Sequence, residues 1–202
     1  MKIAVIQYNA GNIQSVSFAL QRLGIEALVT DDKEKIAAAD KVIFPGVGEA
    51  QSAMQYLQER QLDLFIKNLQ QPVLGICLGM QLMCRYSAEN DTTCLGIFEE
   101  TVQAFEPSPL DQKDRIKTPQ MGWNQITQLS GPLFNKVSDG SYCYFVHGYY
   151  AHLGAHTIAT THYGLSYSSA LHKDNFYGVQ FHPEKSADTG QTILQNFLDL
   201  PL

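Results

Sequence analysis

The stretch that decides the fold is VLGICLGMQ, residues 73–81. An apolar run typical of a buried strand ends there at Cys77, which has a glycine two residues away on either side. A helical pattern begins directly after the cysteine. A strand that turns this sharply into a helix crowds the neighbouring side chains, so small residues are needed at Gly75 and Gly79. The stretch therefore predicts a nucleophile elbow with Cys77 at the carboxyl end of a strand.

An elbow of this kind would also activate a thiol. The N-terminus of a helix carries partial positive charge, which favours the thiolate form of a cysteine placed there. Its free N–H groups, starting at Leu78, can stabilise an oxyanion formed when the sulfur attacks a carbonyl carbon. The alternative is that Cys77 is a buried packing residue, because free cysteine is among the most buried residue types. We interpret Cys84, in the helix predicted over 78–86, as such a packing residue.

On the N-terminal side of the elbow, short apolar runs alternate with helical patterns. This alternation is typical of a parallel sheet covered by helices on both faces. Ligands of such sheets bind at the carboxyl ends of the strands, where the elbow is expected. The predicted strands are 2–6, 25–29, 41–44 and 73–76, and the predicted helices are 12–23, 31–39, 49–70 with a break near Arg60, and 78–86.

The second half of the chain changes character, because its strand-like segments are rich in Tyr, Phe, Thr and Val. A loop with three prolines, 106–119, separates the halves, and a helix over 188–199 closes the chain. We expect one α/β domain over residues 1–202, with a mostly parallel central sheet flanked by helices and an added antiparallel β portion. The predicted strands of the second half are 96–105, 123–129, 142–150, 155–162, 165–172 and 176–181.

Composition narrows the classes of function. The chain has 202 residues, 17% of them charged, and a formal net charge of -6 without any basic block. This argues against nucleic acid or an anionic membrane as the main partner, and no apolar run approaches the roughly 20 residues that span a bilayer. Four irregularly spaced cysteines fit neither a zinc site nor a disulfide framework, which favours reduced thiols in the cytoplasm. We expect no metal and no cofactor.

A thiolate mechanism needs a base, and His182 is the best placed of the six histidines. It follows the apolar strand 177–181, so its ring can reach the same edge of the sheet as Cys77. Glu184 can accept the other ring N–H and fix the tautomer, as the third member of a triad does. The alternatives are a surface His-Pro-Glu turn or a metal site, although His-x-Glu offers only two ligands. The joint occurrence of the elbow and this strand end favours the catalytic interpretation.

Together these motifs resemble the class-I, or triad, glutamine amidotransferases. The superfamily pattern lies in GICLGMQ at 75–81 and FHPEKS at 181–186. PGVG at 45–48 and MGWN at 121–124 narrow the resemblance to the glutaminase subunits of imidazole glycerol phosphate synthase. Further matches follow in order across nearly the whole chain. They are YNAGNIQSV at 8–16, YFVHGYY at 144–150 and the closing segment 190–197.

The resemblance implies that glutamine is hydrolysed to glutamate and ammonia. It assigns Cys77 as the nucleophile, His182 as the general base and acid, and Glu184 as the orienting carboxylate. Gly46 and Val47 match the strand that supplies a second oxyanion N–H beside that of Leu78. Read without the resemblance, the Pro-Gly-Val-Gly stretch is an ordinary strand-ending turn, and it lacks the third glycine of a dinucleotide-binding motif.

The resemblance also implies a partner, a (β/α)₈-barrel synthase subunit that receives the ammonia in a heterodimer. Gln81, Gly148 and Tyr149 match contacts to the substrate glutamine. Met121 and Trp123 match the side facing the barrel, near the route of the ammonia. The alternatives are a solvated helix residue for Gln81, a core residue for Trp123 and strand packing for the tyrosines.

Two positions depart from the family pattern. Gln7 stands where the family often has Asp, and Gly148 stands where it usually has Ser. Glycine can still serve if backbone groups hold the substrate there, although any contact of a serine hydroxyl is lost. Neither position belongs to the triad, so we expect activity.

Three other functions stay open from the sequence. A glutaminase of the same family could serve a different synthase, in vitamin B6 assembly or sugar amidation. A cysteine hydrolase or stress protein could share the elbow on a related α/β fold, and would not use glutamine. A non-catalytic interaction subunit is disfavoured because all three triad positions are filled.

Overall fold

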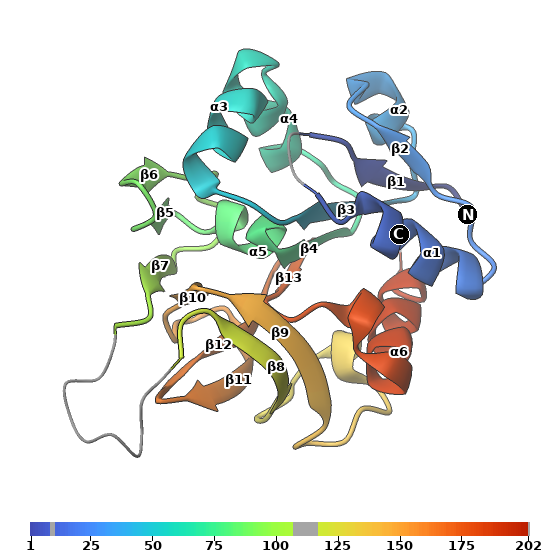
Figure 1. The fold of residues 1–202 in the computed structure, drawn as a ribbon. Helices are drawn as coiled ribbons and strands as arrows, with labels where there is room; N and C mark the ends of the chain where they lie inside the picture. Colours follow the sequence, from blue (N-terminus) through green and yellow to red (C-terminus); the bar gives the residue numbers. More distant parts are fainter. Residues whose placement is uncertain (9–10, 107–116, 202) are drawn as a thin grey trace.

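The computed structural model describes residues 1–8, 11–106 and 117–201. Within these ranges the central feature is an eleven-stranded sheet (Figure 1). Five strands lie side by side in the order β2-β1-β3-β4-β13, and each neighbouring pair is parallel. Because β13 comes from late in the chain, it brings the residues after it beside the end of β4. The five strands are β1 (Ile3–Ile6), β2 (Leu28–Thr30), β3 (Lys41–Gly46), β4 (Val73–Cys77) and β13 (Phe176–Val179).

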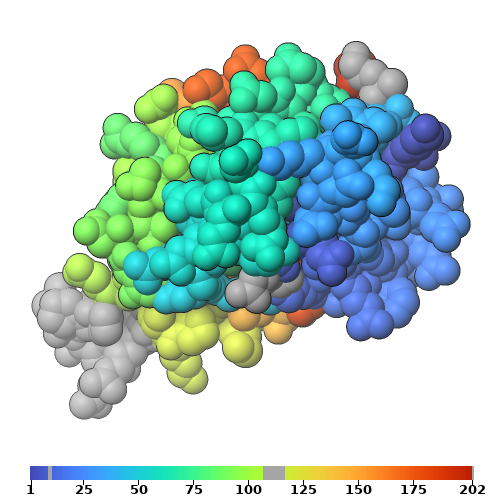
Figure 2. Space-filling view, turned by 90° about the horizontal axis from the view of Figure 1, so that it is seen from above, coloured from blue at the N-terminus to red at the C-terminus, as the bar shows by residue number. Residues whose placement is uncertain are grey.

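Helices bury both faces of these parallel strands. Side chains of β1 alternate between two cores, with Ile3 and Val5 in one and Ala4 and Ile6 in the other, as the two-residue period of a strand requires. One face is covered by α1 and α6, and the other by α2, α3, α4 and α5 (Figure 1). The helices α2, α3 and α4 face the viewer in Figure 2. The helices are α1 (Ile13–Arg22), α2 (Lys33–Ala37), α3 (Ala50–Glu59), α4 (Leu62–Lys67), α5 (Leu78–Met83) and α6 (Ala187–Leu198).

The second half of the chain extends the sheet in the antiparallel sense. β12 pairs with β13, and β10 and β7 follow beyond it. β8 and β9 form a separate two-stranded antiparallel sheet, and Cys143 and Phe145 of β9 join the core under α1 and α6. The expected fold class is therefore confirmed. The remaining elements are β5 (Tyr86–Ser87), β6 (Thr92–Thr93), β7 (Thr101–Ala104), β8 (Gln120–Gln125), η1 (Pro132–Phe134), β9 (Tyr142–His147), β10 (Tyr149–Ala151), β11 (Thr157–Tyr163), β12 (Leu165–Lys173) and η2 (Pro183–Lys185).

Two predicted boundaries are wrong for one shared reason. The helix predicted over 78–86 ends at Met83, and Cys84 lies outside it with an extended backbone (φ -65°, ψ 170°). The chain returns here, and Leu95 N–H donates to the Leu82 carbonyl at 2.8 Å while Ile97 N–H donates to that of Met83 at 2.9 Å. These carbonyls would be needed by a longer helix. The same return leaves only Thr101–Ala104 of the strand predicted over 96–105.

Other boundaries shift by smaller amounts. The strand predicted over 142–150 is interrupted at Gly148, because the chain leaves the β8–β9 sheet there and joins the main sheet as β10. The strand predicted over 123–129 lies at Gln120–Gln125. The break near Arg60 is confirmed, and Gln61 adopts a left-handed backbone (φ 55°) between α3 and α4. Most of the predicted loop 106–119 lies outside the described residues. Among the described residues, no helix has the length and apolar character needed to cross a membrane.

Candidate active site

The backbone at Cys77 has the predicted elbow geometry. Cys77 is the last residue of β4 and directly precedes α5, with φ 54° and ψ -109°. Such a conformation costs a non-glycine residue on the order of 1–3 kcal/mol, and the close packing around it holds it in place. A Cβ added to Gly79 would lie 1.8 Å from the Phe44 carbonyl oxygen, and one added to Gly75 would lie 2.8 Å from the backbone nitrogen of Met80. Both glycines are therefore required by close approach.

His182 and Glu184 meet Cys77 at this edge of the sheet. His182 Nδ1 lies 2.7 Å from Glu184 Oε1, and both side chains are buried. Burial by itself lowers the pKa of His182, but the sulfur of Cys77 and the carboxylate of Glu184 raise it, and the net effect is a pKa of about 10. A protonated imidazole at this position places a positive charge beside the sulfur. The structure thus brings together the three residues that the sequence assigned to a triad.

Two residues given no role by the sequence hold this pair in place. Asn12, just before α1, donates from Nδ2 to Glu184 Oε1 and lies 3.3 Å from His182 Nδ1. Ser186 Oγ donates to the His182 carbonyl at 2.7 Å and accepts the Tyr144 N–H at 2.9 Å. Both residues fall inside segments that carry the family resemblance, which was the available signal.

A cavity of about 280 Å³ opens at the sulfur. Cys77 lines this space but is only 6% exposed. Six of the predicted site residues line this cavity, whereas His182 and Glu184 do not. The rest of the lining consists of residues to which the sequence gave no role in the site. The lining residues are Val47, Gly48, Cys77, Leu78, Gln81, Glu89, Pro119, Val146, His147, Gly148 and Tyr149.

Glu89 is the charged residue among those missed. Burial raises the pKa of its carboxyl group, although the Ala50 N–H, which donates to Oε2 at 2.7 Å, opposes this. A carboxylate in the wall of a small cavity can pair with a cationic group of a ligand. Glu89 lies beyond the end of α5 in sequence, in a stretch without a recognisable motif, so the sequence offered no signal for it.

The turn after β3 forms the opposite wall. Gly46 pairs directly with Cys77 across β3 and β4. Val47 is 36% exposed at the mouth of the cavity, and Gly48 has a φ of +128°. A Cβ on Gly46 would lie 2.1 Å from the hydroxyl oxygen of Tyr8, so glycine is required at this position. Of the predicted oxyanion residues, Val47 and Leu78 line the cavity, whereas Gly46 lies beside Cys77 in the sheet and does not.

Met121 and Trp123 lie outside the cavity, on β8. Their side chains are 66% and 53% exposed, so the alternative that Trp123 is a core residue is wrong. They are nonetheless adjacent to the site, because Met121 pairs across the two-stranded sheet with Val146. Val146 lines the cavity, and its carbonyl oxygen lies 3.7 Å from Cys77 Sγ.

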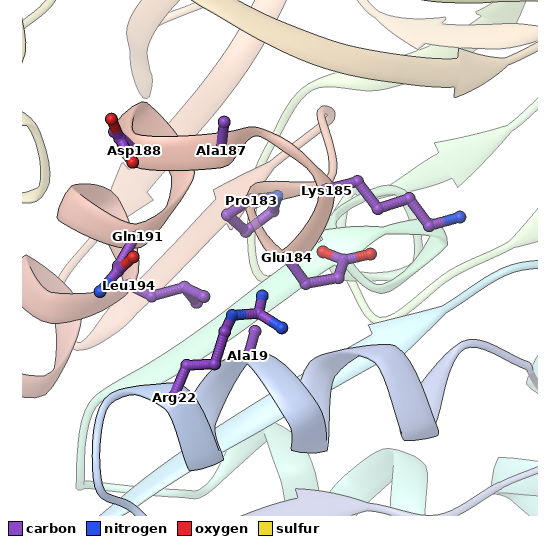
Figure 3. Close-up of a pocket in the computed structure, with 9 residues that line it drawn as sticks. All are labelled: Ala19, Arg22, Pro183, Glu184, Lys185, Ala187, Asp188, Gln191 and Leu194. Atoms are coloured by element: carbon purple, nitrogen blue, oxygen red, sulfur yellow. The ribbon is translucent and has the colours of Figure 1, made fainter.

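A second cavity, of about 330 Å³, lies between α1 and α6 on the far side of Glu184. Figure 3 shows Arg22 extending from α1 toward the turn that carries Pro183 and Glu184. This cavity shares Glu184 with the triad but does not reach the sulfur. Across the described ranges, no three His, Cys, Asp or Glu side chains are grouped closely enough to hold a metal ion.

The arrangement around Cys77 suits acyl transfer from a small amide. It provides a sulfur, an imidazole that can move protons, a carboxylate that can orient that imidazole, and a helix N-terminus directly after the sulfur. The cavity is of a size for a molecule with a few heavy atoms, and it offers a carboxylate at one wall.

Comparison with known proteins gives a consistent result. The family Glutamine amidotransferase class-I matches residues 4–200. Imidazole glycerol phosphate synthase subunit HisH from Bacteroides fragilis is 57% identical over 200 residues, covering 99% of this chain and 100% of that protein. The protein of the same name from Haemophilus influenzae is 44% identical, and the match covers 98% of each chain.

Solved structures with low sequence identity share the fold. A crystal structure of a glutamine amidotransferase superposes with a TM-score of 0.72 at 18% identity, covering 98% of each chain. A glutamine amidotransferase from Thermotoga maritima superposes with a TM-score of 0.64 at 17% identity, covering 98% of this chain and 83% of that one.

Proposed function

This chain belongs to the class-I glutamine amidotransferases, among the HisH subunits of imidazole glycerol phosphate synthase, and we propose that Cys77, His182 and Glu184 are its catalytic residues. It is a cysteine-dependent glutaminase subunit. Its triad would hydrolyse L-glutamine to L-glutamate and ammonia. We further propose that residues 1–202 act as one amidotransferase domain, which the family match over 4–200 supports.

In the proposed reaction, the Cys77 thiolate attacks the carboxamide carbon of glutamine. The Leu78 N–H and an N–H from the Gly46–Val47 turn hold the oxyanion that forms. His182 gives its proton to the departing ammonia, leaving a thioester between Cys77 and the glutamyl group. The imidazole then takes a proton from water, whose oxygen attacks the thioester carbon and releases glutamate and the thiolate.

The cavity wall supports a way to hold the amino-acid end of the substrate. Gly148 and Tyr149 would offer backbone groups, as the resemblance implies. Glu89 is suitably charged to pair with the α-ammonium group of glutamine. Gln81 donates from Nε2 to the Tyr149 carbonyl at 3.0 Å and to Gln180 Oε1 at 2.8 Å, so the polar atom it can offer to substrate is its own oxygen.

The ammonia would pass to a synthase partner. The relatives are named as subunits of imidazole glycerol phosphate synthase, so a second subunit completes the enzyme. We propose that it is a (β/α)₈ barrel bound as a heterodimer against β8, where Met121 and Trp123 are exposed. The ammonia would then serve the formation of imidazole glycerol phosphate and AICAR in histidine biosynthesis. A cytoplasmic location fits the four free thiols.

The observation that carries the proposal is the Cys77 sulfur at a small cavity beside His182, whose pKa is raised by that sulfur and by Glu184. The test follows glutamate release from glutamine by the complex with a barrel subunit, with and without the nucleotide substrate of that subunit. We expect release to require Cys77. Substantial turnover by Cys77→Ala in the complex would refute the nucleophile assignment.

The same assay tests the role of the partner. The turn beside the sulfur contains Gly46 and Gly48, so its peptides can reorient at low cost. Binding of the barrel could then select the orientation that places an N–H at the oxyanion. We expect the isolated subunit to be slower than the complex, and equal rates would contradict this.

A further inference from the structure

Gln180 contacts the proposed nucleophile, although no motif singled it out. It is fully buried between β13 and His182. Its Nε2 donates to Cys77 Sγ at 3.6 Å, and its Oε1 accepts from Gln81 Nε2 at 2.8 Å. An ordinary buried glutamine would use both ends of its amide to satisfy protein groups. Here one end is directed at the sulfur instead.

The orientation of the Gln180 amide is dictated by a neighbouring backbone carbonyl. The Tyr149 carbonyl can only accept hydrogen bonds. It accepts from Gln81 Nε2 at 3.0 Å and from His147 Nδ1 at 2.7 Å. Gln81 must therefore turn its NH₂ group toward the Tyr149 carbonyl, and the second N–H of that group points to Gln180 Oε1. With its oxygen held by that bond, Gln180 has its NH₂ group left for Cys77.

The reversed orientation of Gln180 is strongly disfavoured. It would bring two NH₂ groups together at Gln81 and turn a carbonyl oxygen toward the sulfur. Both a hydrogen bond to Gln81 and the contact with Cys77 would be lost, and the Gln180 side chain is fully buried, so water cannot replace them. The donor at the sulfur is thus set in place before any substrate arrives, which is the condition for preorganised electrostatic stabilisation.

The chain of hydrogen bonds continues from the Tyr149 carbonyl to His147, which lies beside Tyr167. Burial lowers the pKa of His147 to about 4, so its ring is neutral, and with Nδ1–H donating to Tyr149 its Nε2 is an acceptor. The Tyr167 hydroxyl lies 3.3 Å from this Nε2 and 2.9 Å from Gln120 Oε1. Gln120 is the first residue of β8. The hydroxyl carries one proton, which Gln120 Oε1 and His147 Nε2 cannot both accept, so the continuous chain of hydrogen bonds from the sulfur ends at His147.

We propose that Gln180 is a further catalytic residue, whose Nε2–H stabilises the Cys77 thiolate and whose orientation is imposed by Gln81 and the Tyr149 carbonyl. The proposal rests on the proposed function, in which Cys77 is the nucleophile. The bond is charge-assisted while the sulfur is an anion, and it weakens when the sulfur becomes a neutral thioester. Its effect is therefore to raise the fraction of thiolate available for attack.

The test measures alkylation of Cys77 by iodoacetamide against pH in the complex with the synthase subunit, with mass spectrometry to identify the modified cysteine. Gln180→Glu keeps the acceptor for Gln81 and removes the donor, and Gln180→Met removes both. We expect each to slow alkylation of Cys77 at neutral pH by about 10- to 100-fold and to move the profile to higher pH. Gln81 does not contact the sulfur, so Gln81→Met should move the pH profile of alkylation in the same direction but by less.

The control is Ser169→Ala, because Ser169 is buried and its carbonyl accepts the Gln180 N–H at 2.9 Å, but its hydroxyl does not contact the sulfur. It should keep the wild-type profile. The titratable groups that face the site, His182, Glu184, Tyr8, Glu89 and His147, remain in every variant. Gln180→Glu adds a carboxyl group beside the sulfur, so the uncharged Gln180→Met decides whether loss of the donor alone moves the profile.

Circular dichroism shows which of the three variants Gln180→Glu, Gln180→Met and Gln81→Met are folded. An unchanged profile in these would overturn the proposal, even if turnover falls. Turnover by Cys77→Ala would instead remove the proposed function itself, so the two failures are distinguishable.

Discussion

The two ends of α5 hold clusters made of the same three residue types. At its start are Cys77, His182 and Glu184, and just beyond its end is Cys84, near Glu100 and its hydrogen-bonded partner His156. The two histidine–carboxylate pairs have similar geometry, with Nδ1–O distances of 2.7 Å and 2.9 Å. A geometric search for paired histidines and carboxylates would therefore find both.

The clusters differ in which group acts on the thiol. The imidazole of His182 stands next to Cys77, whereas at Cys84 the charge that acts is the carboxylate of Glu100. Burial raises the pKa of Cys84 well above its usual value, and Glu100 raises it further. The backbone adds to the contrast, because a helix N-terminus favours an anion and a C-terminus disfavours one. The order of the three groups, and not their identity, separates the proposed nucleophile from a packing residue.

The largest expected effect comes from exchanging the two cysteines for alanine. Cys77→Ala should lower kcat for glutamate release by about four to six orders of magnitude, as loss of a covalent nucleophile does. Cys84→Ala should keep kcat within about twofold and lower the free energy of unfolding by about 1 kcal/mol, because it leaves a small cavity. Steady-state kinetics of the complex and urea unfolding measure both. Comparable losses of kcat in the two variants would remove the distinction between the clusters.

The two histidines give the next effect. His182→Asn should lower kcat by about 10²- to 10⁴-fold, the range for an acid–base residue. His156→Asn should leave kcat near the wild-type value, because His156 contacts Glu100 and not a reacting group. Its cost should fall on stability, since the Glu100 carboxylate loses the ring N–H. A fall in kcat for His156→Asn at unchanged stability would mean that the second cluster communicates with the first.

The sequence predicted the first cluster because its signals are local. Gly75 and Gly79 indicate the close approach of backbones at the elbow. The apolar strand before His182 indicates that His182 lies at the carboxyl edge of the sheet. The second cluster could not be predicted. It forms only because residues 95–98 return to the last carbonyls of α5, a long-range pairing that the helical pattern through position 86 conceals.

The residues that the sequence missed inside the site follow the same rule. Gln180 lies on a segment that reads as an apolar strand, and its role depends on an amide one turn into a distant helix. Glu89 lines the cavity and accepts a hydrogen bond from the N–H of Ala50, which is 39 residues away in sequence. Asn12 reaches Glu184 across 172 residues. Alternation and spacing predict where a side chain points from its own element, but not which groups from other elements will meet it.

The pH dependence of stability sharpens the contrast further. The pKa of His182 is about 10 in the folded protein, above its ordinary value of 6.5. A raised pKa contributes stability that is complete below the unfolded pKa and is lost as pH rises through the folded pKa. Between pH 6.5 and 10 the wild-type protein should therefore lose more unfolding free energy than His182→Asn, by up to a few kcal/mol.

The measurement is urea unfolding across this pH range with a reductant present, because all four cysteines are free thiols. Wild type and His182→Asn share every other titrating group, so their difference reports the imidazole together with its coupling to Cys77 and Glu184. His156→Asn serves as the parallel comparison for the second cluster. Identical pH profiles for wild type and His182→Asn would show that the sulfur and Glu184 do not hold a proton on this ring.

The smallest expected effect concerns hydrogen bonds left unmade. Both oxygens of Glu100 contact the His156 ring, whereas around the first cluster the Tyr8 hydroxyl and Glu184 Oε2 are buried without a partner among the described residues. Tyr8→Phe keeps the ring, which packs on Phe44 at 5.1 Å between centroids, and removes the unpaired hydroxyl. It should raise the free energy of unfolding by about 1 kcal/mol.

The matched control is Tyr167→Phe, because the Tyr167 hydroxyl is also buried but lies within hydrogen-bond distance of Gln120 and His147. That variant should lose about 1 kcal/mol, the opposite sign. Urea unfolding at pH 7 gives both values. If Tyr8→Phe is destabilising, its hydroxyl has a partner in solution, and the turn at Gly46, which the hydroxyl touches, is where that partner should be sought. A stabilised Tyr8→Phe would show that this edge of the sheet retains an unsatisfied polar group that the second cluster does without.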